Sequence, residues 1–131
     1  MRERITRHRQ ERGPRFTTVE APIHVEAAVA ADPTDEGGAV ILDCLTLWCA
    51  NLLFAGLDDA AMHARFSALA ETMASANRPV FVVTNEVGLG IIPGDPLSRR
   101  YADLLGRLNQ EVAARAKRVT LMIAGIPLVV R

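Results

Sequence analysis

Short runs of consecutive apolar residues alternate along this chain with longer segments in which apolar residues recur every three or four positions. Residues 39–42 and 79–83 are short, rich in β-branched side chains and apolar at successive positions, a pattern typical of strands buried on both faces. Between them, the Leu-rich segment that ends at Phe54 and residues 58–76 predict two helices. The second helix has an apolar stripe formed by Met62, Phe66, Leu69 and Met73.

The first third of the chain predicts shorter elements. Residues 2–12 predict a helix that ends at Gly13-Pro14, because this pair cannot continue an α-helix. Residues 16–19 resemble a short strand, and residues 23–31 a short helix. Residues 32–38 are rich in turn-forming side chains and predict a loop.

The last third contains the clearest amphipathic helix, whose apolar residues are Leu97, Tyr101, Leu104, Leu105, Leu108 and Val112. Residues 119–123 then predict another buried strand, which a final apolar run to Val130 follows. Because strands alternate with helices, we predict an α/β fold with a mainly parallel sheet and helices on both faces. The length of 131 residues fits a single domain.

Composition and charge restrict the location and the partners. The formal net charge is zero, so no overall field attracts nucleic acid or a membrane surface. The longest apolar stretch, residues 40–54, is interrupted by Asp43 and Asn51, so no membrane span is expected. Cys44 and Cys49 predict buried free thiols, which fits a reducing cytoplasm. Six arginines among the first fifteen residues indicate either a solvated helix or a phosphate contact.

Polar residues directly follow the two predicted central strands. Asp43 ends the first strand, and Thr84, Asn85 and Glu86 follow the second, before a loop containing Gly88. Ligands of open α/β sheets bind outside the carboxyl ends of strands, so these residues predict one wall of a binding site. Asp43 could hold Mg²⁺ beside a nucleotide, directly or through water, or could instead cap the following helix.

Two basic clusters are further candidates. On a helix, Arg4 and Arg12 would flank His8 one turn away on either side, and their charges would keep its imidazole neutral and nucleophilic. A neutral histidine among arginines suits covalent nucleotidyl transfer, although a surface histidine on a basic helix is the alternative. Arg99 and Arg100 could contact an anion or a carboxylate, or simply form a solvated start of a helix.

Taken together, the motifs resemble the bifunctional adenosylcobinamide kinase / adenosylcobinamide-phosphate guanylyltransferase family of cobalamin biosynthesis, and the resemblance spans nearly the whole chain. The most specific pieces are Thr-Asn-Glu-Val-Gly at residues 84–88 and Asp-Cys-Leu-Thr at residues 43–46. The motifs occur in the family's order: Arg-Ile-Thr-Arg-His-Arg at residues 4–9, Phe-Thr-Thr-Val-Glu at 16–20, Leu-Asp-Cys-Leu-Thr-Leu-Trp at 42–48, Val-Thr-Asn-Glu-Val-Gly-Leu-Gly-Ile-Ile-Pro at 83–93, and Gly-Arg-Leu-Asn-Gln at 106–110.

The resemblance implies a P-loop NTPase of the RecA-like type, a homotrimer, and two reactions that use ATP and GTP with Mg²⁺. A nucleoside triphosphate phosphorylates adenosylcobinamide. GTP then guanylylates a histidine, and GMP passes to adenosylcobinamide-phosphate to give adenosylcobinamide-GDP. The histidine matches His8, and Asp43 matches the Walker-B-like acid. The residues that fall where the family contacts the guanine nucleotide are Arg9, Gln10, Glu11, Arg12, Glu20 and Asp43. The remaining candidates for substrate or phosphate contacts are Thr84, Asn85, Glu86, Gly88, Arg99 and Arg100.

One departure from the family is clear. The phosphate loop Gly-x-x-x-x-Gly-Lys-Ser/Thr occurs nowhere in the 131 residues. We therefore expect a single nucleotide-binding domain over residues 1–131 that lacks the family's first strand, P-loop and first helix, through a misplaced start or a truncated gene product. Such a chain should bind nucleotide weakly, lack kinase activity and aggregate. The alternatives are a catalytically inactive remnant that acts as a binding or assembly subunit, and an unrelated α/β domain that binds phosphates without a P-loop.

Overall fold

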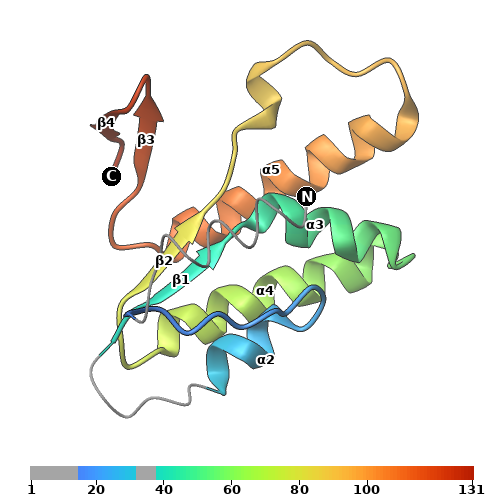
Figure 1. Cartoon of the computed structure of the whole chain (residues 1–131). Helices are drawn as coiled ribbons and strands as arrows, with labels where there is room; N and C mark the ends of the chain where they lie inside the picture. Colours follow the sequence, from blue (N-terminus) through green and yellow to red (C-terminus); the bar gives the residue numbers. More distant parts are fainter. Residues whose placement is uncertain (1–14, 32–37) are drawn as a thin grey trace.

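The computed structural model describes residues 15–31 and 38–131, which form four α-helices, two pairs of strands and one 3₁₀ turn (Figure 1). The predicted helix over residues 2–12 and most of the predicted loop over residues 32–38 lie outside the described residues. The elements are, in chain order, α2 (Val25–Ala30), β1 (Val40–Asp43), α3 (Leu45–Phe54), α4 (Asp59–Ser75), β2 (Val80–Val83), η2 (Val87–Leu89), α5 (Pro96–Arg115), β3 (Thr120–Ile123) and β4 (Ile126–Val129).

Strands β1 and β2 form a parallel pair in which Val40 lies opposite Val80 and Asp43 lies opposite Val83. Parallel neighbours need a long crossover connection, which α3 and α4 supply here. The carboxyl ends of both strands therefore meet at the same edge of this small sheet.

The core lies where α3, α4 and α5 pack together beside the sheet. Its centre contains Trp48 and Phe66, whose ring centroids are 5.9 Å apart. The stripe predicted for α4 is confirmed, because Met62, Phe66 and Leu69 are fully buried. Helix α3 contributes Leu45, Cys49 and Leu52, and helix α5 contributes Leu104, Leu105 and Leu108. Burial of these side chains supplies most of the driving force for folding.

Only one face of the β1–β2 sheet is covered in the described part of the chain. Leu42 is buried against the helices, whereas Ile41, Phe81 and Val83 on the opposite face are 50%, 59% and 45% exposed. The expected mainly parallel sheet with helices on both faces is therefore found only in part. The apolar pattern of both strands indicated two buried faces, but the described helices cover only one of them.

Strands β3 and β4 form an antiparallel hairpin that stands apart from the β1–β2 sheet (Figure 1). The hairpin turn consists of Ala124 and Gly125, with φ angles of 50° and 79°. Positive φ at both turn residues matches the right-handed twist of the paired strands. A strand is thus present at Thr120–Ile123, as predicted, but the prediction that it is buried is wrong, because Met122 and Ile123 are 59% and 55% exposed. It pairs with the apolar run after it rather than with β2.

Two further outcomes concern the strand predicted at residues 16–19 and the expected absence of a membrane span. Residues 16–19 form no strand; Phe16 and Val19 are 48% and 62% exposed, and no described segment pairs with them. Within the described residues, the other predicted helices and the two central strands are confirmed to within a few residues. Among the described residues, no helix is both long and apolar enough to cross a membrane.

Candidate functional site

The site predicted at the strand ends lies at the shared edge of β1 and β2. Asp43 is the last residue of β1, where the peptide bond that joins it to Cys44 is cis. Its register partner, Val83, is the last residue of β2, so Thr84 leaves the sheet beside Asp43. The structure therefore brings Asp43 and residues 84–86 to one edge, as the alternation of strands and helices predicted.

Asn109 of α5 is hydrogen-bonded to all three residues that follow β2. The Thr84 hydroxyl donates to Asn109 Oδ1 at 2.7 Å. Asn109 Nδ2 donates to the backbone carbonyl of Asn85 and to Glu86 Oε1, at 3.1 Å each. One amide side chain thus holds the first three residues of this loop.

Thr46, in the first turn of α3, joins the end of β1 to the same network. Asn85 Nδ2 donates to the Thr46 hydroxyl at 2.9 Å, and the Tyr101 hydroxyl of α5 donates to the Thr46 carbonyl at 3.2 Å. Burial raises the pKa of Tyr101 above its usual range, so its hydroxyl stays protonated and able to donate. The two strand ends are therefore connected through side chains from α3 and α5.

Sequence reasoning assigned no role to Thr46 or Asn109, although both belong to motifs that carry the family resemblance. One signal was available for Asn109. It lies four residues after Leu105 and eight after Tyr101, so it continues the apolar stripe of α5 with a polar amide. A polar side chain at such a position requires a hydrogen-bond partner, which here is the strand-end loop.

The loop after Glu86 is strongly apolar and exposed. It begins with η2 and extends away from the sheet before it returns to α5 (Figure 1). Leu89, Ile91 and Ile92 are 81%, 97% and 81% exposed. Gly88 is also exposed, and a Cβ built there would meet no atom within 4 Å. Among residues 15–31 and 38–131, therefore, no steric contact requires glycine at this position.

Arg99 and Arg100 lie at the first turns of α5 and bind groups of the chain itself. Arg99 Nη1 donates to the carbonyls of Pro93 and Gly94, at 2.9 and 2.7 Å. Arg100 contacts the Asp59 carboxylate and the Leu57 carbonyl, which joins the start of α5 to the start of α4. At a rise of about 1.5 Å per residue, Arg99 lies about 15 Å along the helix from Asn109. The structure therefore separates these arginines from the strand-end network.

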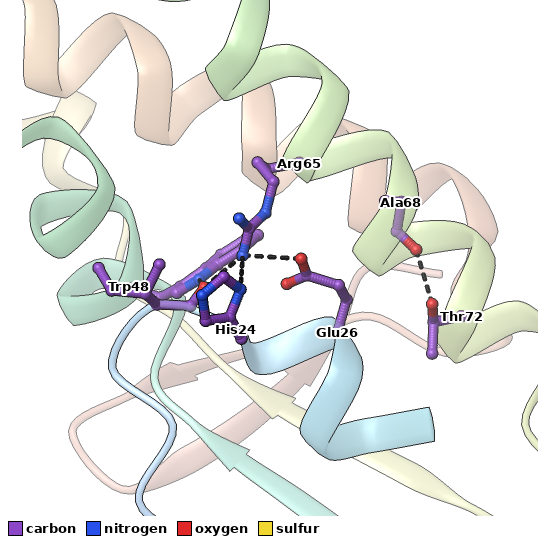
Figure 2. Close-up of polar contacts among 7 residues, drawn as sticks. His24, Glu26, Trp48, Arg65, Ala68 and Thr72 are labelled. Carbon is purple, nitrogen blue, oxygen red and sulfur yellow. Dashed lines mark hydrogen bonds and ion pairs between the residues drawn. The ribbon is translucent and has the colours of Figure 1, made fainter. Parts of the chain in front are cut away.

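Glu20 lies in the exposed segment that leads to α2. Shortly after Glu20, Arg65 of α4 contacts His24 and Glu26 (Figure 2). The Ile23 carbonyl accepts hydrogen bonds from Trp48 Nε1 at 2.9 Å and from Arg65 Nη2 at 2.5 Å. Arg65 Nη2 also pairs with Glu26 Oε1 at 2.7 Å. Together these contacts join α2 and the residue Ile23 before it to α3 and α4.

The two cysteines are both free thiols, but their environments differ. Cys49 is fully buried, and burial raises its pKa to about 11. Its thiol is therefore protonated and unreactive at neutral pH. Cys44 is only partly buried, at the start of α3 beside Asp43. The prediction of buried free thiols is confirmed for Cys49 alone.

The donors at the strand-end edge suit Mg²⁺ in their chemistry. The described residues contain no group of three or more His, Cys, Asp or Glu side chains that could hold a metal. Mg²⁺ at nucleotide sites, however, uses one or two carboxylates together with water and substrate phosphates. The Asp43 carboxylate and the hydroxyl of Thr46, three residues further along the chain, are hard oxygen donors of this kind. The proposed nucleophile His8 and the residues Arg9, Gln10, Glu11 and Arg12 lie outside the described residues.

Comparisons with a family model and with individual proteins point to the same family. Residues 1–130 match the family described as cobinamide kinase / cobinamide phosphate guanyltransferase. The chain is 38% identical, over 128 residues, to the bifunctional adenosylcobalamin biosynthesis protein CobP of Pseudomonas aeruginosa, covering 98% of this chain and 73% of that protein. It is 36% identical, over 138 residues, to the proteins named CobU of Escherichia coli and Salmonella typhimurium, covering 96% of this chain and 76% of each. The chain therefore belongs to the cobinamide kinase / cobinamide phosphate guanyltransferase family.

Proposed function

We propose that this protein phosphorylates adenosylcobinamide and then transfers GMP from GTP to adenosylcobinamide-phosphate. The observation that carries the proposal is the convergence of Asp43, Thr84, Asn85 and Glu86 at one sheet edge, in a chain that matches this family over residues 1–130. The relatives are named as bifunctional proteins of adenosylcobalamin biosynthesis, which supports a transferase that uses nucleotides.

In the guanylyltransferase half, His8 is the proposed nucleophile. A neutral imidazole nitrogen attacks the α-phosphorus of GTP, a P–N bond forms, and the bond to pyrophosphate breaks. A phosphate oxygen of adenosylcobinamide-phosphate then attacks the same phosphorus, and the P–N bond breaks, which regenerates His8. Arg9, Gln10, Glu11, Arg12 and Glu20 are the proposed guanine-nucleotide contacts.

In the kinase half, the strand-end residues bind and orient the reactants. Thr84, Asn85 and Glu86 are proposed to contact phosphate or the cobinamide, with Gly88, Arg99 and Arg100 as further candidates at the edge of the site. Mg²⁺ bound at Asp43, directly or through water, would neutralise phosphate charge there. Phosphoryl transfer depends mainly on such positioning and charge compensation, so small shifts of these side chains should lower the rate.

Labelled GTP tests the proposed covalent step. The protein as its own gene expresses it should form an adduct that is stable to base and labile to acid, and His8→Ala should abolish it. His24→Ala is the matched control, because His24 is an exposed histidine in a different part of the chain. An adduct of unchanged yield on the His8→Ala variant would exclude His8 as the acceptor.

A second candidate function follows from the missing phosphate-loop motif. If the 131 residues act without this motif, the protein is a catalytically inactive binding or assembly subunit. It would still present the strand-end edge of β1 and β2 to a nucleotide. Titration of the 131-residue chain with GTP and Mg²⁺, followed by a cobinamide phosphorylation assay, separates the two functions. We expect weak nucleotide binding and no phosphorylation from this chain alone, because no Gly-x-x-x-x-Gly-Lys-Ser/Thr cradles the triphosphate.

The proposed assembly is a homotrimer. The exposed apolar side chains of the sheet and of the loop after Glu86 supply surface that a second subunit could cover. Sedimentation equilibrium at several concentrations tests this proposal directly. A single monomeric species up to the highest concentration would contradict it.

A further inference from the structure

We infer that Asn109 is a positioning residue for the kinase step and that it acts by orienting Glu86 and Asn85 at the strand-end edge. The inference rests on the proposed function, which gives the strand-end residues their contact with phosphate or cobinamide. Asn109 lies on α5, distant in sequence from both strands, and the structure alone brings it to the edge.

The hydrogen-bonding groups of Asn109 are matched to this position. A carboxamide has one oxygen acceptor and two N–H donors. The oxygen accepts from Thr84, and the nitrogen donates both to the Asn85 carbonyl and to a Glu86 carboxylate oxygen. Aspartate at this position would lose both donors and would place a second carboxylate against Glu86. Alanine would lose every one of these side-chain contacts. Asparagine, in contrast, can bond to all three partners at once.

Asn109 is also held rigidly, whereas the residues that it contacts are not held by a sheet or helix. Leu105 and Leu108, which lie in the turn of α5 just before Asn109, are both fully buried. Thr84, Asn85 and Glu86 lie between the end of β2 and the start of η2, and all three are exposed. An exposed loop without backbone pairing is mobile unless side chains restrain it. Asn109 therefore restrains the loop by connecting it through hydrogen bonds to a helix that is packed in the core.

The bond to Glu86 has the strongest functional consequence. Asn109 Nδ2 donates to Glu86 Oε1, and this contact restrains the direction in which the Glu86 side chain points. The contact between Asn85 and Thr46 restrains the neighbouring side chain toward α3. Loss of the Asn109 contacts should therefore leave the groups present but misplaced, which lowers turnover more than it lowers nucleotide affinity.

The experiment uses the full protein as its own gene expresses it and measures GTP- and ATP-dependent phosphorylation of cobinamide. Asn109→Ala should reduce kcat about 10–100-fold, the range usual for residues that orient catalytic groups, with KM for the nucleotide changed less than about threefold. Gln110→Ala is the matched control, because it removes an exposed amide from the next position of the same helix. It should retain the wild-type kcat.

A paired variant separates positioning from folding. Asn109→Asp places two carboxylates together and should lower both the melting temperature and kcat. Adding Glu86→Gln restores a hydrogen bond between the two side chains with the donor and acceptor exchanged. The double variant should therefore regain melting temperature but not turnover, because the Glu86 carboxylate is then absent. Recovery of both properties together would show that turnover does not need the Glu86 carboxylate that Asn109 orients, and that result would overturn the inference.

Backbone NMR relaxation of residues 84–86 completes the test independently of activity. We expect lower order parameters for these residues in Asn109→Ala than in Gln110→Ala. Equal order parameters, or an unchanged kcat in an active protein, would refute the positioning role. A wild-type protein that phosphorylates no cobinamide would refute the proposed function instead, and the relaxation data would still decide whether Asn109 orders the loop.

Discussion

The ion pair between Arg65 of α4 and Glu26 of α2 is the contact whose removal should be most informative about how the Glu20 segment is held. Figure 2 shows both side chains beside Trp48 and His24, at the junction of three helices. The side chains of Arg65 and Glu26 are only 22% and 20% exposed. Glu26 Oε2 and Arg65 Nε are buried, and within the described part of the chain they have no hydrogen-bond partner. The pair is therefore largely desolvated but incompletely satisfied.

We predict that Arg65→Met lowers the free energy of unfolding by about 2 kcal/mol. Exposed ion pairs contribute about 0–1 kcal/mol, and removing one partner of a fully buried pair costs about 3–5 kcal/mol, so a pair at this exposure lies between. Methionine keeps most of the apolar stem, so the loss comes from the uncompensated Glu26 carboxylate and from the Ile23 carbonyl, which retains only Trp48. Glu26→Gln keeps an acceptor for Arg65 and should cost about 1 kcal/mol.

Urea denaturation followed by fluorescence is the assay, because Trp48 is the single tryptophan and is buried at this junction. The double variant with Met at both positions should be more stable than Arg65→Met alone, since it no longer buries an unpaired charge. Arg115→Met is the control; Arg115 is exposed and should change stability by less than about 0.5 kcal/mol. The reasoning is refuted if Arg65→Met is no more destabilising than this control, or if the two substitutions at the ion pair are additive within about 0.5 kcal/mol.

Three further predictions concern the thiol, a helix cap and the open sheet face. The folded-state pKa of Cys49, about 11, lies above the ordinary value of 9.0, so the stability that its neutral thiol provides is fully present below pH 9 and is lost between pH 9 and 11, by roughly 2–3 kcal/mol. Cys49→Ala should flatten that part of the stability–pH curve. An equally steep curve in the variant would argue against the thiol as its cause. Asp58→Ala should cost about 1 kcal/mol in thermal unfolding, because Asp58 caps α4 through the Ala61 amide at 2.8 Å, while Asp58→Asn should cost far less; equal losses would contradict a capping role. Phe81→Lys should reduce self-association of the 131-residue chain in light scattering with little loss of stability, since Phe81 is 59% exposed on the sheet face that the described helices leave uncovered; unchanged scattering would place the association elsewhere.

The local elements were predictable because each depends on a pattern that neighbouring residues already contain. Helices α4 and α5 follow from apolar side chains at helical spacing. The strand at Val80–Val83 follows from its β-branched run. The convergence of Asp43 with residues 84–86 was also predictable, since parallel strands joined by helices must end at the same edge.

Contacts between distant segments could not be predicted in the same way. The sequence contains Asn109 and Thr46 without indicating that either would meet the loop after β2, because that depends on how α3 and α5 rotate against the core. The hydrogen bond from Arg65 to the Ile23 carbonyl likewise joins residues that are 42 positions apart in the sequence. Apolar strands also indicated a sheet covered on both faces, yet coverage depends on which helices are available to pack there.

The sequence by itself therefore determined the family, the α/β class and the identity of the polar groups at the strand ends, because these are properties of motifs and of local periodicity. Only the tertiary structure decided how those groups are held. Hydrogen bonds and ion pairs operate over a few ångströms, and only packing of the helices brings Asn109 to Glu86 and Arg65 to Glu26 within that range.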